Sequence, residues 1–311
     1  MYENIVIEGG GIRAYASIGV LQELEKRNKL SSIKRIAGTS AGSIIATLLA
    51  LDCSSDEMKK YYDLMDMAPY KIKYYSILTY YNLLYKRGIH DSYHMKDNVI
   101  SKILNEKIGR DDITFKEIYD LYGKILVITG TCLNKREIHY YHLESNPNMK
   151  IKDAIQISCC IPFLFQPIEW NQNTMVDGAV LLNYPLYFFD DNEIIPNSRN
   201  GIVTENEGNV NKKTLGIKFI DHTTTKNSKI FTGNDPTKST IQYVSCITNT
   251  MVTQIERLSM RSDYWEQTIA INLEHSISIT DMSLSEKQKQ EMIKQGIDSA
   301  CSYFKDQVNA V

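Results

Sequence analysis

The sequence has little of several features that mark common classes of protein. Its 311 residues carry a formal net charge of only -2, so no excess of basic residues indicates nucleic-acid binding. No apolar run approaches the roughly 20 residues needed to span a bilayer. The N-terminus lacks the basic region and apolar run of a secretory signal. These absences predict a cytoplasmic protein that binds no nucleic acid and meets membranes only transiently, from the surface.

Residues with metal-ligand or disulfide spacing are also lacking. The cysteines show no CxxC spacing and lie mostly in apolar stretches, which favours buried, reduced thiols over disulfides or a zinc site. They are Cys53, Cys132, Cys159, Cys160, Cys246 and Cys301. The histidines form no metal-ligand pattern; they are His90, His94, His139, His142, His222 and His275. We therefore expect no metal and no cofactor.

No repeat or linker divides the chain, and 43% of its residues are hydrophobic, which is enough for a sizeable core. We expect a single domain over residues 1–311. Hydrophobic periodicity predicts strands at 4–8, 34–37, 124–132, 137–143, 174–176, 214–220 and 268–273. It predicts helices at 14–26, 44–51, 56–67, 90–106, 114–122, 151–160 and 239–263, and a last helix from 283 to about 304. The polar stretches 197–213 and 221–238 are expected to be loops.

The alternation of strands and helices predicts an α/β fold, a three-layer α/β/α sandwich with a mainly parallel central sheet. The last helix is expected to begin with a capping box made by Ser283 and Glu286.

The pentapeptide Gly38-Thr39-Ser40-Ala41-Gly42 lies between a short strand and an apolar helix. This is the context of a nucleophile elbow, in which a sharp turn exposes the serine and the flanking glycines avoid collisions with the neighbouring backbone. The N-terminus of the following helix would favour negative charge at the hydroxyl. The alternative is that Ser40 only caps the helix.

Gly9, Gly10 and Gly11 form a second glycine-rich turn between a strand and a helix. The dinucleotide-binding motif requires an acidic residue about 20 positions further on, and the Walker motif requires Gly-Lys followed by Ser or Thr; both are lacking. An oxyanion hole remains, with Gly10 and Gly11 as the best donors. Arg13 is expected to brace this loop, or else to be an ordinary surface arginine.

Asp177-Gly178-Ala179 is a third short motif. Alone, an aspartate before glycine most often marks a turn. In this order and spacing, however, the motifs at Gly9, Gly38 and Asp177 resemble those of the patatin-like phospholipase family. The resemblance implies a patatin-like fold with a Ser-Asp dyad, in which Ser40 is the nucleophile, Asp177 is the base, the glycine loop is the oxyanion hole and no histidine takes part.

The resemblance extends over nearly the whole chain. Residues 154–163 with Pro162, the segment Asn183-Tyr184-Pro185 and residues 285–304 with Gly296 are similar to further parts of the family. It implies a calcium-independent lipid acyl hydrolase of the phospholipase A or lysophospholipase type, acting on a phospholipid or another acyl lipid. The sequence leaves open whether a protein activator is needed.

Three other readings stay open at this point. An α/β-hydrolase esterase would use Ser40, Asp177 and either His222 or His275 in that order. A catalytically silent scaffold could bind lipid or protein on the same fold. A nicotinamide-dependent enzyme is disfavoured because the acidic residue is missing and Asp177 would have no use.

A tyrosine-rich segment at about 61–93 interleaves aromatic, aliphatic and basic residues. Its tyrosines are Tyr61, Tyr62, Tyr70, Tyr74, Tyr75, Tyr80, Tyr81, Tyr85 and Tyr93, and its basic residues include Lys71, Lys73, Lys86 and Arg87. Such a mixture suits a lipid-water interface. We predict a helical cap or membrane-docking surface here; the alternative is that half of these tyrosines pack in the core.

Overall fold

The structure is a computed structural model, and it describes residues 1–65, 68–70, 76–192, 210–220, 240–273 and 284–309. Its main sheet has the strand order β10-β9-β1-β2-β4-β8-β7, with β5 also paired to β4. A second, two-stranded sheet joins β3 to β6. The strands are β1 (Asn4–Ile7), β2 (Arg35–Gly38), β3 (Gly88–His90), β4 (Ile125–Cys132), β5 (Glu137–Tyr141), β6 (Phe163–Phe165), β7 (Ile168–Trp170), β8 (Asn173–Asp177), β9 (Thr214–Ile220) and β10 (Thr268–Asn272).

The central strands β10, β9, β1, β2 and β4 are all parallel, whereas β5 and β8 run antiparallel to β4. Alternate side chains of the central strands enter different cores, as the two-residue period of a strand requires. In β1, Ile5 and Ile7 join the larger core and Val6 joins the smaller one. Because both faces are buried, these strands are short apolar runs without polar alternation.

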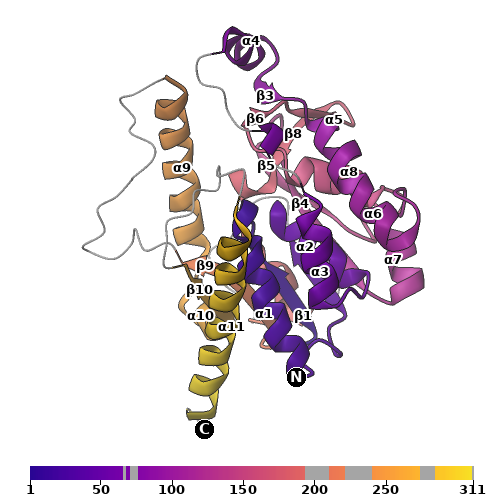
Figure 1. The fold of residues 1–311 in the computed structure, drawn as a ribbon, viewed down its shortest axis with the longest axis vertical. Helices are drawn as coiled ribbons and strands as arrows, with labels where there is room; N and C mark the ends of the chain where they lie inside the picture. Colours follow the sequence, from indigo (N-terminus) through magenta and orange to yellow (C-terminus); the bar gives the residue numbers. More distant parts are fainter. Residues whose placement is uncertain (66–67, 71–75, 193–209, 221–239, 274–283, 310–311) are drawn as a thin grey trace.

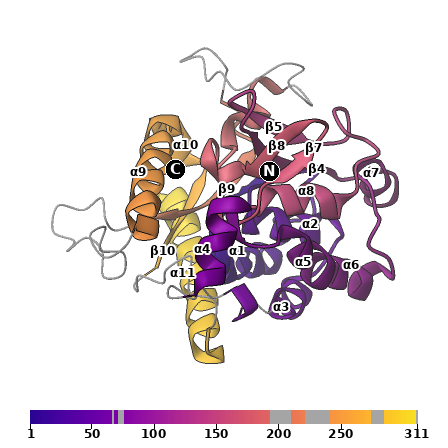
Figure 2. The same ribbon diagram turned by 90° about the horizontal axis from the view of Figure 1, so that it is seen from above.

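Helices cover both faces of the sheet (Figures 1 and 2). They are α1 (Ala14–Lys26), α2 (Ala41–Ala50), α3 (Ser55–Asp63), α4 (Ile77–Tyr85), α5 (Ser92–Met95), α6 (Ser101–Ile108), α7 (Phe115–Tyr122), α8 (Ile151–Ser158), α9 (Thr240–Ser259), α10 (Ser262–Glu266) and α11 (Glu286–Asn309). The larger core packs under α1, α2, α8 and α11, and the smaller one under α10 and the 3-10 helix Leu186–Asn192. The fold is therefore the expected three-layer sandwich with a mainly parallel sheet. Within the described ranges, no helix is long and apolar enough to cross a bilayer.

The first and last helices of the chain, α1 and α11, lie side by side (Figure 1). They touch backbone to backbone through two glycines. A Cβ atom on Gly19 would lie 2.0 Å from the carbonyl oxygen of Ile293, and one on Gly296 would lie 1.9 Å from that of Ala16. Such distances leave no room for any side chain, so these glycines bring the C-terminal helix close enough to complete the core.

Several predicted elements are confirmed, and others are corrected. The helix at 14–26 and the strand at 214–220 are found with those bounds, and the strands predicted at 124–132 and 137–143 are found as β4 and β5, which pair antiparallel. The helix predicted at 90–106 was placed too early, because residues 88–90 form β3 and Asp91 caps the helical stretch by accepting from the Tyr93 N–H. The helix predicted at 239–263 is divided into α9 and α10.

The predicted capping box of α11 is also corrected. The structure places this cap at Ser285, whose hydroxyl accepts from the Gln288 N–H while the Gln288 side chain accepts from the Ser285 N–H. Ser283 lies outside the described residues, as do residues 221–239 and most of the predicted loop at 197–213. The short strands β3, β6 and β7 were not predicted, because three residues are too few to display a period.

The tyrosine-rich segment is divided between core and surface. Tyr61, Tyr62 and Tyr70 are buried, whereas Tyr80, Tyr81, Tyr85 and Tyr93 are exposed. Tyr74 and Tyr75 lie outside the described residues. The buried members pack as ordinary core side chains, and the exposed ones gather mainly on α4.

The close contact between α1 and α11 leads to a prediction about stability. Gly296→Leu should lower the free energy of unfolding by about 2–3 kcal/mol, because overpacking forces the two helices apart. Urea unfolding followed by circular dichroism measures this. Lys294→Leu adds the same side chain at an exposed position of the same helix and serves as control. Equal stability of the two variants would contradict the packing described above.

Candidate active site

Ser40 stands between β2 and α2, at the turn that the sequence predicts to be an elbow. Its backbone has φ 51° and ψ -130°, a conformation that costs a residue other than glycine about 1–3 kcal/mol. A Cβ on Gly38 would lie 2.4 Å from the Gly42 carbonyl oxygen, and one on Gly42 would lie 2.4 Å from the Ile7 carbonyl oxygen. Both flanking positions therefore require glycine, and the turn holds Ser40 in its unusual conformation.

The side chains of Ser40 and Asp177 meet although they are 137 positions apart in sequence. The Ser40 hydroxyl donates to Asp177 Oδ2 at 2.8 Å. Sheet topology explains the meeting: β2 runs parallel to β4 and ends with Gly38 opposite Ile128. The antiparallel strand β8 ends with Asp177 opposite Gly130. Both strands thus deliver their last residues to the same part of β4.

Asp177 is buried, and its surroundings control its protonation. Burial raises the pKa of Asp177 to about 7, although hydrogen bonds from the Ala179 N–H and the Ser40 hydroxyl oppose the rise. The Ala179 N–H donates to Oδ1 at 2.8 Å, so each carboxylate oxygen has one donor. Gly178 lets this turn approach β4, because a Cβ there would lie 2.2 Å from Thr129 Oγ1.

The end of α8 supports the elbow from the side. The Ser40 N–H donates to the buried hydroxyl of Ser158 at 2.8 Å, and the Asp177 N–H donates to the Cys160 carbonyl at 2.9 Å. Burial, together with the negative charge of Asp177, raises the pKa of the Cys159 thiol well above its usual value, so this neighbour stays protonated. The sequence did not single out Ser158 or Cys159 for this place, because only tertiary packing brings them to Ser40.

The glycine loop lies against Ser40. A Cβ on Gly9 would lie 3.0 Å from Ser40 Cβ and 2.4 Å from Asn183 Oδ1. The Gly9 N–H donates to the Asn183 carbonyl at 3.3 Å, so it is already used. The first hydrogen bond of the following 3-10 turn is donated by the Arg13 N–H to the Gly10 carbonyl. The N–H groups of Gly10 and Gly11 come before it in the chain and donate no hydrogen bond within that turn.

Arg13 and Tyr62 hold the loop by its carbonyl oxygens. Arg13 Nε donates to the Gly10 carbonyl at 3.3 Å, and the Tyr62 hydroxyl donates to the Gly11 carbonyl at 2.9 Å. The Arg13 guanidinium also stacks on the Phe219 ring at 4.9 Å from its centroid. Arg13 therefore contacts the loop directly, and its role as a brace of the loop stays a prediction.

A buried ion pair directly before the loop was not predicted from the sequence. Glu8 accepts from the Lys218 ammonium, and its second oxygen accepts from the Phe219 N–H at 2.5 Å. Burial raises the pKa of Glu8 to about 7, whereas Lys218 lowers it. Asn183 Nδ2 donates to Gly9 O and to Glu256 of α9. This network ties β1, β9 and α9 to the base of the glycine loop.

The histidines of the described residues lie elsewhere. Burial lowers the pKa of His142 to about 4, and its ring packs beside Phe188. His90 and His94 flank Tyr70, and His139 bonds to Glu137. His222 and His275, the two triad candidates, lie outside the described residues. Over the described ranges, no cluster of three or more His, Cys, Asp or Glu side chains is arranged to hold a metal ion.

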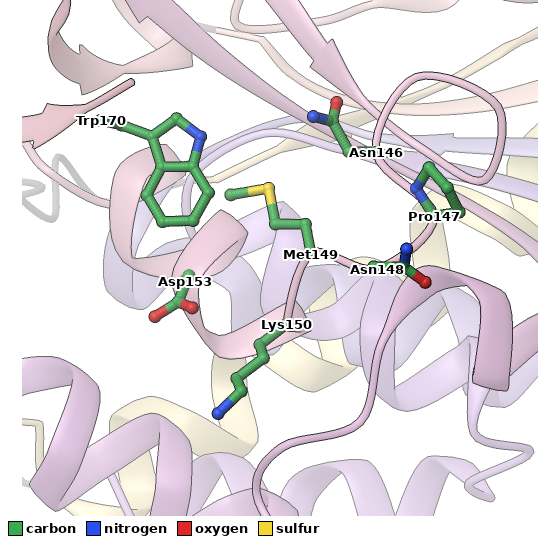
Figure 3. A pocket seen from close by; sticks show the side chains of 7 residues that line it. All are labelled: Asn146, Pro147, Asn148, Met149, Lys150, Asp153 and Trp170. Carbon is green, nitrogen blue, oxygen red and sulfur yellow. The ribbon is translucent and has the colours of Figure 1, made fainter. Parts of the chain in front are cut away.

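A hollow of about 450 Å³ opens at the N-terminal end of α8 (Figure 3). Its lining residues are Asn146, Pro147, Asn148, Met149, Lys150, Asp153 and Trp170. Ser158 lies at the other end of the same eight-residue helix, about 12 Å away along its axis. The hollow is therefore separate from the meeting point of Ser40 and Asp177.

Comparison with known proteins places these residues in a family. The chain is 29% identical to uncharacterized protein R571 of Acanthamoeba polyphaga mimivirus over 96% of this chain and 92% of that protein. It is 29% identical to the probable lipid hydrolase 463L of Invertebrate iridescent virus 6 over 60% of this chain and 62% of that one.

A solved structure supports the same fold. The crystal structure of VipD from Legionella pneumophila superposes with a TM-score of 0.59 at 17% identity, covering 98% of this chain and 67% of VipD. The sequence model of the patatin-like phospholipases matches residues 5–190, which is more than half of the chain and includes Ser40, Asp177 and the glycine loop. The protein therefore belongs to the patatin-like phospholipase family of lipid hydrolases.

Proposed function

We propose that the protein is a lipid acyl hydrolase of the phospholipase A or lysophospholipase type, with Ser40 as nucleophile and Asp177 as its only general base. The observation that carries the proposal is the direct hydrogen bond of 2.8 Å from Ser40 Oγ to Asp177 Oδ2. It joins a strained serine at a strand-to-helix turn to a buried carboxylate, which is the geometry expected of an activated nucleophile and its base.

In the first half of the reaction, Ser40 Oγ attacks the ester carbonyl carbon and its proton passes to Asp177. The carbonyl oxygen becomes an oxyanion, for which the N–H groups of Gly10 and Gly11 are the proposed donors. The ester C–O bond then breaks, and the leaving alcohol takes the proton from Asp177. An acyl-enzyme on Ser40 remains.

In the second half, Asp177 accepts a proton from a water molecule that attacks the acyl carbon. The bond to Ser40 Oγ then breaks, the serine recovers its proton from Asp177, and a fatty acid leaves. A carboxylate that both accepts and donates a proton works best when its pKa is close to the working pH. The raised pKa of Asp177, about 7, meets this requirement.

The loop beneath the oxyanion needs to be rigid, because donors act only when they are oriented before the charge develops. Gly9 lacks a side chain and so lets the loop lie close to Ser40, and its N–H donates to the Asn183 carbonyl. Arg13 and the pair of Glu8 with Lys218 are proposed as positioning residues that hold Gly10 and Gly11 in place.

The esterase alternative places an imidazole between the serine and the aspartate. Here the two side chains touch directly, and the second carboxylate oxygen is taken by the Ala179 N–H. This arrangement favours a dyad over a triad with His222 or His275. It also disfavours a silent scaffold, because a buried serine-carboxylate pair at a strained turn has a cost that binding alone does not need.

The dyad leads to a prediction for site variants. With a soluble p-nitrophenyl ester and calcium chelated, Ser40→Ala should lower kcat/KM by about 10³-fold or more. Asp177→Asn should lower it by at least about 10²-fold, because the general base is lost. His222→Ala and His275→Ala should retain wild-type rates. An equal loss in either histidine variant would point to a triad, and an inactive wild type would favour the scaffold.

Ionisation of Asp177 leads to a second prediction. Its carboxylate must be ionised to accept the serine proton, and its pKa is raised, so activity should be lost as the pH falls through about 7. We expect log kcat/KM on the soluble ester to rise with unit slope and to level off above that value. Melting temperatures over the same range control for unfolding. A flat profile between about pH 5 and pH 8 would be incompatible with this role.

The pair of Glu8 and Lys218 leads to a third prediction. Lys218→Met leaves a buried carboxylate unpaired and should destabilise the fold by about 3–5 kcal/mol. The double variant Glu8→Gln/Lys218→Met should recover much of that loss. If the pair positions the glycine loop, this double variant should still show kcat reduced by about tenfold or more with KM little changed.

Lys213→Met is the control for that pair, because Lys213 forms a more exposed ion pair with Glu3, just before the first residues of β9 and β1. It should leave both the melting temperature and kcat unchanged. A double variant that is stable and fully active would show that the buried pair has no role in positioning the loop.

A further inference from the structure

The helix α4 has its apolar side chains on the outside. Helices at the surface of a folded protein normally turn an apolar stripe to the core. In α4 the buried side chain is Thr79, whereas the large apolar side chains other than the half-buried Leu83 are exposed. They are Ile77, Leu78, Tyr80, Tyr81, Leu84 and Tyr85. An apolar face of this kind marks a surface that binds a partner or a membrane.

A side-chain hydrogen bond connects this helix to the rest of the protein. Asn82 Nδ2 donates to the Ile89 carbonyl at 3.0 Å, which ties α4 to the following strand β3. That strand in turn pairs with β6, with Gly88 opposite Phe163. One face of α4 therefore contacts the protein, and its apolar face is exposed to solvent.

The helix α4 lies at the same end of the molecule as the candidate active site. Figure 1 places α4 at the tip opposite the two termini, and Figure 2, seen from above, has it in front of the body of the molecule. The strand β6 follows α8, whose Ser158 holds the Ser40 N–H. The strands β1 and β2 also end towards this tip, with the glycine loop and the elbow at their carboxyl ends. Phe163 at the start of β6 adds a further exposed aromatic side chain.

The charged residues that directly follow α4 are basic. Lys86 and Arg87, which follow the helix directly, are exposed. The stretch between Asp66 and Asp91 contains four basic residues, Lys71, Lys73, Lys86 and Arg87, and no acidic one, in a chain whose formal net charge is -2. An apolar and aromatic face beside basic side chains is complementary to an anionic lipid surface, where each basic residue adds to the attraction.

We propose that α4 docks the protein on the surface of an anionic lipid bilayer. Ile77, Leu78 and Leu84 enter the boundary between headgroups and acyl chains, the tyrosines lie at headgroup level, and Lys86 and Arg87 meet lipid phosphates. The inference rests on the proposed function and deepens it. It names the form in which the substrate is presented, an assembled anionic surface in place of single lipids in solution.

A second copy of the chain is a weaker candidate for this face. The helix has nine residues and is therefore about 14 Å long. A stable interface buries roughly 800 Å² on each partner, more than one short helix supplies. A lipid surface needs no matching shape, so a small amphipathic element is sufficient to anchor reversibly.

The test uses Ser40→Ala protein, so that vesicles are not consumed and binding is measured apart from catalysis. Flotation with vesicles of phosphatidylcholine alone, or of phosphatidylcholine with phosphatidylserine at about three to one, gives the partition coefficient. We expect stronger binding to the anionic vesicles. Leu78→Glu/Leu84→Glu should lower it by about tenfold or more, because two apolar anchors become acidic.

A closely matched control is available. Leu78 and Leu84 are 64% and 73% exposed, and Leu121 of α7 and Leu258 near the end of α9 are 66% and 76% exposed. Leu121→Glu/Leu258→Glu makes the same chemical change away from α4 and should bind like the parent apart from the effect of two added charges. Lys86→Glu/Arg87→Glu should weaken binding to anionic vesicles by roughly fivefold or more per residue and should change binding to neutral vesicles little.

Three results would overturn the proposal: no binding of the parent to either vesicle, equal loss in the two leucine pairs, or a dimer in gel filtration that only Leu78→Glu/Leu84→Glu dissociates. The last would assign the face to a second copy. Ester hydrolysis by protein that retains Ser40 tests the proposed function separately, since vesicle binding by the Ser40→Ala protein does not depend on it.

Discussion

The rest of the structure depends on one buried contact, the hydrogen bond from the Ser40 hydroxyl to Asp177. The two side chains meet at 2.8 Å because β2 and β8 end at the same part of β4. In this mixed sheet, β2 runs parallel to β4 and ends opposite Ile128, whereas β8 runs antiparallel and ends opposite Gly130. The parallel core sets the position of Ser40, and the hairpin end of the sheet sets that of Asp177.

Glycines make this contact sterically possible. Around Ser40, the positions of Gly9, Gly38, Gly42 and Gly178 all lie within 2.2–2.4 Å of another atom once a Cβ is added. These glycines let the loop, the elbow and the aspartate turn pack closely against their neighbours. Gly19 and Gly296 likewise let α1 and α11 approach closely, so glycines make close contacts possible both at the site and in the core.

The sequence identifies residues of the candidate site where the signal is local. A short apolar strand, glycines and an apolar helix define the elbow within a few residues, and the resemblance to a family adds Asp177. It does not predict Ser158, because a serine at the end of a helix has no local signal that it will hold a distant N–H group. Glu8 and Lys218 are missed for the same reason: they are 210 positions apart and become partners only when β9 pairs with β1. The pairing of β3 with β6, which carries α4, is likewise a product of tertiary packing.

The candidate site lowers the stability of the fold, and the raised pKa of Asp177 shows at which pH it does so. Burial raises the pKa of Asp177 from 3.8 to about 7, so ionising it destabilises the folded state. The loss begins as the pH rises above the unfolded value and is complete above about 7, where it amounts to roughly 4 kcal/mol. The backbone of Ser40 adds about 1–3 kcal/mol more. Packing elsewhere must offset both, and the continuous core beneath α1, α2, α8 and α11 is the part of the molecule large enough to do so. A carboxylate kept in this environment against such a cost is easier to understand as a proton acceptor than as a structural residue, since an amide of the same shape would accept from the Ala179 N–H, donate to the Ser40 oxygen and carry no charge.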